Sequence, residues 1–214
     1  MPLATRTVLA ALLVAGVAGC AGGVPTTSGT GGLPTPAESA NTAITVNRLQ
    51  DGKFLSFVGP KTQHDAPFLG VPNTNYDLLR SLLDTRTGEV ANQLYVEDSY
   101  AGTRRDWNAA QDANGQPLRF IPISNSEITC ESGCSYAEEF AAVLPEPLMR
   151  ASTGGLMVTF IAKSGAHTVI QIPGSQVAAQ LAAVASAKEG LAAAAAPAAA
   201  APAPAAAPPP PPAK

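Results

Sequence analysis

The chain has 214 residues and a formal net charge of −3, with 14% charged and 5% aromatic residues. Lysine and arginine are scattered, and Arg104-Arg105 is the only adjacent basic pair. Binding to nucleic acid needs a basic stripe that follows the phosphates, so we expect no nucleic-acid partner. The length suffices for one domain with a substantial core.

The amino-terminal residues have the pattern of a secretion signal. Arg6 and the amino terminus form a positive start, and an apolar segment follows at residues 8–17. Such a segment extends about 15 Å as a helix, half of a bilayer's hydrocarbon core, so we expect no permanent transmembrane helix. Val17-Ala18-Gly19-Cys20 then resembles the lipobox of bacterial lipoproteins. The resemblance implies that residues 1–19 are removed and that Cys20 carries lipid such as palmitate. The alternative is an ordinary signal peptide that is cut nearby.

The same resemblance implies a location. Several acyl chains on Cys20 would hold the protein to a membrane almost irreversibly, since each buried methylene contributes about 0.8 kcal/mol. Ala21 stands where Asp is the usual signal for retention in the inner membrane, which favours the outer membrane and a periplasmic orientation.

The two ends of the mature chain differ in composition from its middle. Residues 20–42 are small and carry one charge, Glu38, which predicts a flexible tether. Residues 191–214 are almost entirely Ala and Pro, which predicts a disordered tail with polyproline II character. The tail is either compositional drift or a spacer that reaches peptidoglycan or a partner.

Residues 43–190 are predicted to form one β-rich domain. Turn signals separate five pairs of strand-like segments: 43–49 and 53–58, 76–83 and 90–100, 106–111 and 116–123, 126–130 and 134–143, and 155–162 and 167–172. Successive hairpins predict a mainly β fold, an antiparallel sandwich, meander or barrel of about 8–10 strands.

Side-chain patterns within these segments predict the core. Alternation over residues 93–100 places Leu94, Val96 and Asp98 on one face and Tyr95, Glu97 and Ser99 on the other. The run at residues 156–161 is apolar on both faces, so we expect a central strand. The predicted core residues are Trp107, Phe120, Phe140, Leu156, Val158 and Phe160.

Two helices are predicted near the end of the domain. The first is a single turn at residues 145–150, with proline at its start. The second is an amphipathic helix at residues 175–188 with Ser175 as its N-cap. Its apolar stripe (Val177, Leu181 and Val184) is expected to dock on the sheet, and the alternative is a helix that binds a partner.

Cys130 and Cys134 lie on opposite sides of a predicted hairpin loop. In a secreted chain these two cysteines favour a structural disulfide that fixes strand register. A redox pair normally has two intervening residues and an electropositive setting, whereas here there are three, with Glu131 among them. A zinc site would need His64 and His167 as well, and no spacing suggests it, so we predict no metal site.

No catalytic constellation is visible. The chain has neither a Gly-x-Ser-x-Gly elbow nor a phosphate-binding glycine loop. His64 and His167 are interpreted as solvated loop residues, and neighbouring side chains such as His64 and Asp65 rarely face each other. The adjacent acids Glu138-Glu139 and Glu97-Asp98 would point to opposite faces of a strand, which argues against cooperating pairs. We therefore predict no catalytic residue and no cofactor, while a pair distant in sequence could still converge.

Several aromatic residues are compatible with a binding groove. Tyr95, Tyr100, Trp107, Tyr136 and Phe140 either line a glycan or peptide groove or pack across strands. For the groove, the patch of interest is Arg104, Arg105 and Trp107.

Together these features predict a lipid-anchored protein of the bacterial cell envelope. We expect a non-enzymatic accessory or structural component that binds another envelope protein or the cell wall. One alternative is a cell-wall hydrolase or its inhibitor, which converging carboxylates in a cleft would indicate. The other is a small-ligand carrier, which an aliphatic cavity of about 300–1,000 Å³ would indicate. An unpaired edge strand would favour the binding component.

Overall fold

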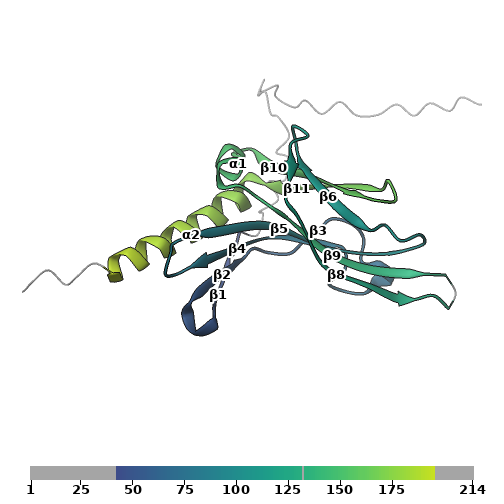
Figure 1. Ribbon diagram of the computed structural model, residues 1–214, viewed down its shortest axis with the longest axis horizontal. Helices are drawn as coiled ribbons and strands as arrows, with labels where there is room; N and C mark the ends of the chain where they lie inside the picture. Colours follow the sequence, from purple (N-terminus) through teal and green to yellow (C-terminus); the bar gives the residue numbers. More distant parts are fainter. Residues whose placement is uncertain (1–41, 132, 196–214) are drawn as a thin grey trace, which may run out of the picture. The chain divides into compact units, whose positions relative to one another are not determined.

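A computed structural model describes residues 42–131 and 133–195 (Figure 1). The predicted signal peptide, the lipid site at Cys20 and nearly all of the tether and tail lie outside this part of the chain. None of the helices in the described part is both long and apolar enough to span a bilayer.

The described residues form two antiparallel sheets in a sandwich-like arrangement (Figure 1). The larger sheet has the order β1-β2-β4-β5-β9-β8, with β3 beside β4. Its strands are β1 (Thr45–Leu49), β2 (Phe54–Val58), β3 (Thr62–Gln63), β4 (Tyr76–Asp84), β5 (Val90–Ala101), β8 (Phe120–Thr129) and β9 (Ser135–Val143). The smaller sheet has the order β11-β10-β6-β7. Its strands are β6 (Trp107–Asp112), β7 (Pro117–Leu118), β10 (Gly155–Ala162) and β11 (His167–Pro173).

This architecture confirms the predicted fold class. The eleven strands of the described part exceed the predicted number because β3 and β7 are only two residues long. Short 3-10 turns at Gln50–Gly52 and Phe68–Gly70 complete the connections. Four of the five predicted hairpins are present: β1–β2, β4–β5, β8–β9 and β10–β11.

The fifth predicted hairpin is wrong in its second strand. Leu118 pairs with Ala110 in the smaller sheet, whereas Phe120 pairs with Ala142 in the larger sheet. The chain therefore crosses between the sheets at Arg119, and residues 116–123 belong to two strands. Residues 120–129 instead form one strand, β8. Periodicity could not reveal this crossing, because the backbone stays extended through it.

The core lies between the sheets. Leu94 and Val96 from β5 pack there with Phe140 from β9 and with Val158 and Phe160 from β10. The ring centroids of Phe140 and Phe160 are 4.9 Å apart. Of the six predicted core residues, five are buried, and Phe120 is half-buried against them.

The predicted central position of residues 156–161 is confirmed. β10 is central in its sheet, but Met157 is exposed on the outer face. Apolar residues on that face reflect β propensity rather than burial.

Two helices cover one end of the sandwich. They are α1 (Glu146–Ala151) and α2 (Gly174–Ala195), and α2 packs against β2, β4, β10, β11 and α1 (Figure 1). Val177 and Val184 are buried, as the apolar stripe predicted. The helix starts one residue before the predicted cap and continues past Lys188 to Ala195. The prediction of a disordered tail from residue 191 is therefore wrong for residues 191–195, because alanine favours helix as well.

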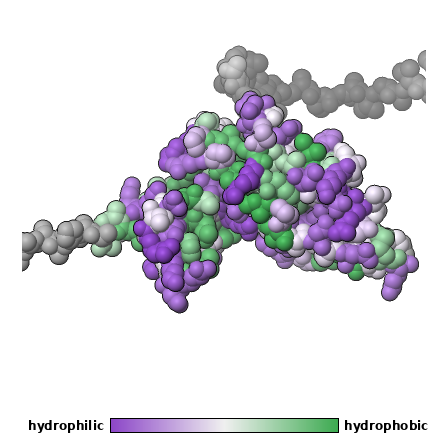
Figure 2. Space-filling view, in the orientation of Figure 1, coloured by the Kyte–Doolittle hydropathy of each residue, from purple (hydrophilic) through white to green (hydrophobic). Residues whose placement is uncertain are grey.

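The contact between α2 and the sheet also contains a polar residue. Gln180 is fully buried, and its Nε2 donates to the Phe57 carbonyl (3.1 Å) and to Ser81 Oγ (2.9 Å). On the face in Figure 2, apolar residues gather over the middle, and hydrophilic residues cover the β1–β2 hairpin.

Candidate functional site

The candidate site is built around Trp107, the first residue of β6. Its indole is buried between the sheets, with its ring centroid 5.2 Å from that of Phe140. Trp107 lines two separate surface pockets, one beside β8 and one beside β11. Trp107, which the sequence singled out, therefore lies between two concave surfaces.

Asp98 of β5 holds the indole and the neighbouring arginine. The indole Nε1 of Trp107 donates to Asp98 Oδ2 (2.7 Å). Nη1 of Arg105 donates to both carboxylate oxygens of Asp98, each at 2.8 Å. Because Asp98 is buried, its charge requires these partners.

Glu138 of β9 holds the backbone of the same segment. Its carboxylate accepts the amides of Asp106 (3.0 Å) and Trp107 (3.1 Å) and the hydroxyl of Tyr100. Asp106 has φ of +54°, a conformation that few non-glycine residues adopt. Glu138 thus fixes the turn that leads into β6. Burial and the hydrogen bond to Glu138 raise the pKa of Tyr100 above its usual range.

The two acids of β5 lie directly opposite the two acids of β9. Adjacent acids do alternate between faces, as predicted, but the register places Asp98 opposite Glu138 and Glu97 opposite Glu139. Cross-strand partners share a face, so Asp98 and Glu138 lie side by side towards the core. One sequence alone could not reveal this pairing, because it depends on the register between β5 and β9.

The second acid of β5 anchors a loop on the opposite face. Glu97 accepts the backbone amide of Asn75 (2.5 Å) and the hydroxyl of Ser99. Oδ1 of Asn75 in turn accepts the amide of Ser99 (2.7 Å), and its carbonyl accepts the amide of His64 (3.0 Å). Asn75 therefore connects β5 to the segment that carries His64. No local pattern in the sequence marks Asn75 as a functional residue.

The pocket beside β8, here called the β8 groove, has a volume of about 340 Å³. Trp107, Phe120 and Phe140 supply aromatic surface to it, and Pro122, Ile123 and Asn125 come from β8. The ladder between β8 and β9 shifts register between Pro122 and Ser124. The groove therefore lies at a bulge, where β8 is bent.

The pocket beside β11, here called the histidine pocket, has a volume of about 420 Å³. Its polar lining consists of His64, Asp65, Asp98, Arg105, His167 and Thr168. The two histidines are the only ones in the sequence. Strand pairing across both sheets thus brings together two residues that are 103 positions apart.

The interpretation of His64 as a solvated loop residue is wrong. Its side chain is only 9% exposed, and Nδ1 lies 3.6 Å from Oδ1 of Asp77, whose side chain is 1% exposed. Within the described part of the chain, neither His64 Nδ1 nor Asp77 Oδ2 has a hydrogen-bond partner. Burial raises the pKa of Asp77, and the neighbouring His64 partly offsets this increase. Asp77 lies on β4, 13 positions after His64 in the sequence. The two side chains meet only because the chain between them folds back on itself, so the sequence alone does not reveal the pair. His167 is exposed, as expected.

The two arginines of the predicted patch have different surroundings. Arg105 lies over the ring of Tyr100, 4.1 Å from its centroid, and is paired with Asp98. Arg104 is more exposed, forms an ion pair with Asp106 (3.2 Å) and donates to the side chain of Asn125 on β8. Arg104 therefore links the turn before β6 to the edge of the larger sheet.

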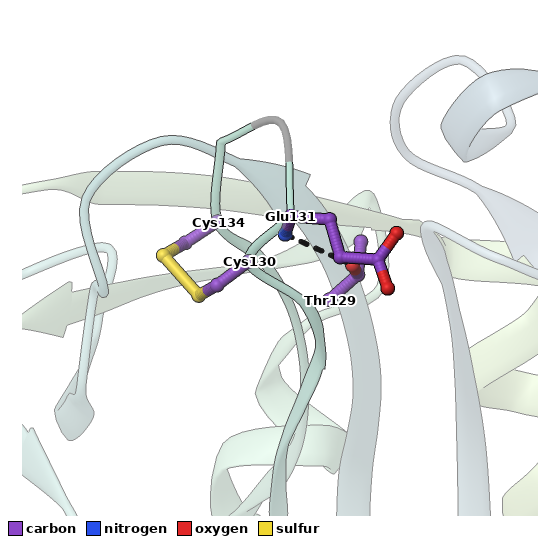
Figure 3. The surroundings of a disulfide bond; sticks show 4 residues. All are labelled: Thr129, Cys130, Glu131 and Cys134. Carbon is purple, nitrogen blue, oxygen red and sulfur yellow. Dashed lines mark hydrogen bonds between the residues drawn. A yellow bond between two sulfur atoms is a disulfide. The ribbon is translucent and has the colours of Figure 1, made fainter.

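Cys130 and Cys134 form a disulfide at the end of the β8–β9 hairpin (Figure 3). Their sulfur atoms are 2.15 Å apart, and the backbone amide of Glu131 donates to Thr129 Oγ1 (3.3 Å). Figure 3 shows the two sulfurs on the opposite side of the loop from the Glu131 carboxylate. The pair is well placed to fix the register of β8 on β9.

No three His, Cys, Asp or Glu side chains within the described ranges come close enough to hold a metal ion. The described residues define an antiparallel β-sandwich with a polar site where its two sheets meet. Comparisons with protein-family models, with curated proteins and with solved structures found no match.

Proposed function

We propose that this chain is a lipid-anchored envelope protein that binds an extended segment of another envelope protein along β8, without enzymatic activity. The observation that carries the proposal is the free edge of this strand. β8 ends the larger sheet, and no strand in the described ranges pairs with its side away from β9.

β8 is unusual in its exposure. It is ten residues long, and every residue from Pro122 to Thr129 is exposed, although its neighbour β9 is largely buried. Proteins commonly protect edge strands with lysine, with proline or with bulges. β8 has Pro122 and two bulges, but these lie on either side of the regular segment Ser124–Glu127. This segment leaves backbone groups free for an added strand.

The chemistry around β8 indicates the kind of segment that fits. Ile123 and Ile128 are exposed, and Glu127 is the only charged residue in the strand. The β8 groove is lined by Phe120, Pro122 and Ile123 above the buried rings of Trp107 and Phe140, with Glu138 and Glu139 beside them, and in this proposal it receives a side chain of the added strand. We therefore expect an extended partner segment with an apolar anchor residue, because backbone bonds supply affinity and pockets supply specificity.

The lipobox supports the location. A lipid on Cys20 would confine the domain to a membrane surface, and residues 20–42 would separate it from that surface. A confined binding domain meets a partner in the same envelope at a high effective concentration.

The hydrolase alternative has less support. Asp98 and Glu138 lie together, but both already accept hydrogen bonds from groups of the protein. A catalytic pair needs an acid that is free to exchange a proton with substrate.

Crosslinking in intact cells followed by mass spectrometry tests the proposal. Ile128→Lys places a charge on the β8 edge, and Val46→Lys is the matched control on β1, at the other edge of the same sheet. Both isoleucine and valine are 52% exposed. We expect one abundant envelope partner with the native chain and with Val46→Lys, and loss of that partner with Ile128→Lys.

The anchor requires its own test. Cys20→Ser is expected to move the protein from the membrane fraction to the soluble fraction and to reduce crosslinking to the partner. Recovery of peptidoglycan fragments alone, or of a second copy of this chain alone, would contradict the proposed partner. Membrane retention of Cys20→Ser would contradict the lipid anchor.

A further inference from the structure

The histidine pocket contains chemistry that a strand-binding function does not use. Five of its lining residues carry ionisable or charged side chains, and they come from the loop after β3, from β5, from the turn before β6 and from β11. The β8 groove lies on the other side of Trp107 and shares with this pocket only that residue.

The orientation of His64 determines what the pocket offers. Nδ1 faces the Asp77 carboxylate at 3.6 Å, and Asp77 is almost completely buried. A carboxylate at this position favours a proton on Nδ1. The opposite ring nitrogen, Nε2, is then an acceptor available to the pocket. No described residue provides a hydrogen-bond partner for Nδ1, so the described part of the chain leaves this buried pair incompletely satisfied.

The charge balance of the pocket favours a cation. The guanidinium of Arg105 already compensates the charge of Asp98, and the indole of Trp107 donates a further hydrogen bond to it. Asp65 contributes an exposed carboxylate whose one partner within residues 42–131 and 133–195 is the amide of Ala66, at 2.7 Å. Among the two carboxylates that line the pocket, Asp65 is therefore the one without a cationic partner in the described part of the chain.

We propose that the histidine pocket binds a small hydroxylated primary amine, such as an amino sugar, with its ammonium group on His64 Nε2 and the Asp65 carboxylate. A volume of about 420 Å³ accommodates a monosaccharide. Thr168 and the guanidinium nitrogens of Arg105 that do not contact Asp98 provide partners for hydroxyl groups. A metal ion fits less well, since no three side chains of the described part converge as ligands.

The two histidines make the test direct. Because they are the only histidines of the chain and both line this pocket, imidazole proton signals in an NMR titration report on it without background. The titration uses the full chain in detergent with glucosamine as the probe. Glucose is the matched probe, since it has a hydroxyl in place of the amine.

We expect glucosamine to shift the imidazole signals saturably, and glucose at equal concentration to leave them unchanged. Asp65→Asn should weaken the binding of glucosamine about three- to tenfold, because an exposed charged partner contributes modestly. Asp51→Asn, an acid in the β1–β2 turn, should have no effect. His64→Gln should abolish binding as followed at the remaining His167 signal.

Three results would overturn the proposal. The first is that glucosamine leaves both imidazole signals unmoved. The second is that glucose shifts them as much as glucosamine does. The third is that Zn²⁺ shifts them saturably and glucosamine does not, which would assign the pocket to a metal ion instead.

Discussion

Asp98 and Glu138 face each other across β5 and β9, and together they hold the segment 105–107 by its side chains and by its backbone. Asp98 binds the guanidinium of Arg105 and the indole of Trp107, whereas Glu138 binds two successive amides. This arrangement connects the larger sheet to the first strand of the smaller one. It also positions the residue that separates the β8 groove from the histidine pocket.

Replacement of Trp107 by Phe tests the bond to Asp98. Trp107→Phe keeps an aromatic ring in the core but removes the Nε1 donor, which leaves a buried carboxylate oxygen with one fewer partner. We expect a loss of about 1–3 kcal/mol in the free energy of unfolding, measured by urea denaturation. In a double-mutant cycle with Asp98→Asn, the two losses should not add. Full additivity would show that the bond contributes nothing.

Glu138→Gln tests the anchoring of the turn before β6. The neutral amide retains one acceptor oxygen, so at least one of the amides of Asp106 and Trp107 loses its partner. Hydrogen exchange at these two amides is expected to accelerate at least about tenfold, equivalent to about 1.4 kcal/mol. Glu139→Gln, on the opposite face of β9, is the matched control and should leave both amides protected. Equal effects of the two variants would contradict the assignment.

The buried Asp77 predicts a specific pH dependence. Its folded pKa is raised above the ordinary 3.8 by burial, so the folded state binds this proton more readily than the unfolded state. The stability that depends on the protonated carboxyl is therefore lost as pH rises from 3.8 through the folded pKa. Asp77→Asn does not titrate and should gain stability relative to the native chain as pH rises from 3.8 through the raised pKa of Asp77, measured by urea denaturation.

Asp84 provides a control of opposite sign. The hydrogen bond from Arg86 lowers the pKa of Asp84, so this group stabilises the fold above 3.8 and loses that effect as pH falls through its folded pKa. Asp84→Asn should therefore lose stability relative to the native chain as pH rises. The same direction of change in both variants would contradict the burial argument for Asp77.

The disulfide is expected to act locally. It closes a loop with a sequence separation of four, so its removal by Cys130→Ser and Cys134→Ser together should cost only about 1–2 kcal/mol. Hydrogen exchange should accelerate near Thr129 and Ser135, where the ladder ends, and remain unchanged in β10. Global unfolding of the double variant at room temperature would show that the disulfide has a larger role.

The sequence was informative where a signal was local. Turn residues and alternation predicted the β1–β2, β4–β5, β8–β9 and β10–β11 hairpins and the apolar stripe of α2, because these features involve neighbouring residues. It was not informative where the signal was a register or a crossing. The switch of sheets at Arg119, the pairing of Asp98 with Glu138 and the meeting of His64 with Asp77 all depend on contacts between distant segments.

The residues of the candidate site also fall into those that a local pattern predicted and those that only long-range contacts reveal. The sequence contains one basic pair close to a tryptophan, namely Arg104, Arg105 and Trp107. In the structure each of these three side chains has a specific partner on a neighbouring strand. The loop that carries Asn75 and His64 has no such pattern. Its position follows from hydrogen bonds to Glu97 and Ser99, which no local rule predicts.

Site-specific photocrosslinking in intact cells tests the central claim most directly. A photoreactive residue is placed at Ile128 on β8 or, for comparison, at Val46 on β1, the two edges of the larger sheet. If β8 receives a partner strand, position 128 should crosslink to one envelope protein and position 46 should not, and Cys20→Ser should reduce the yield. Equal crosslinking at both edges, or none at position 128, would contradict binding at β8.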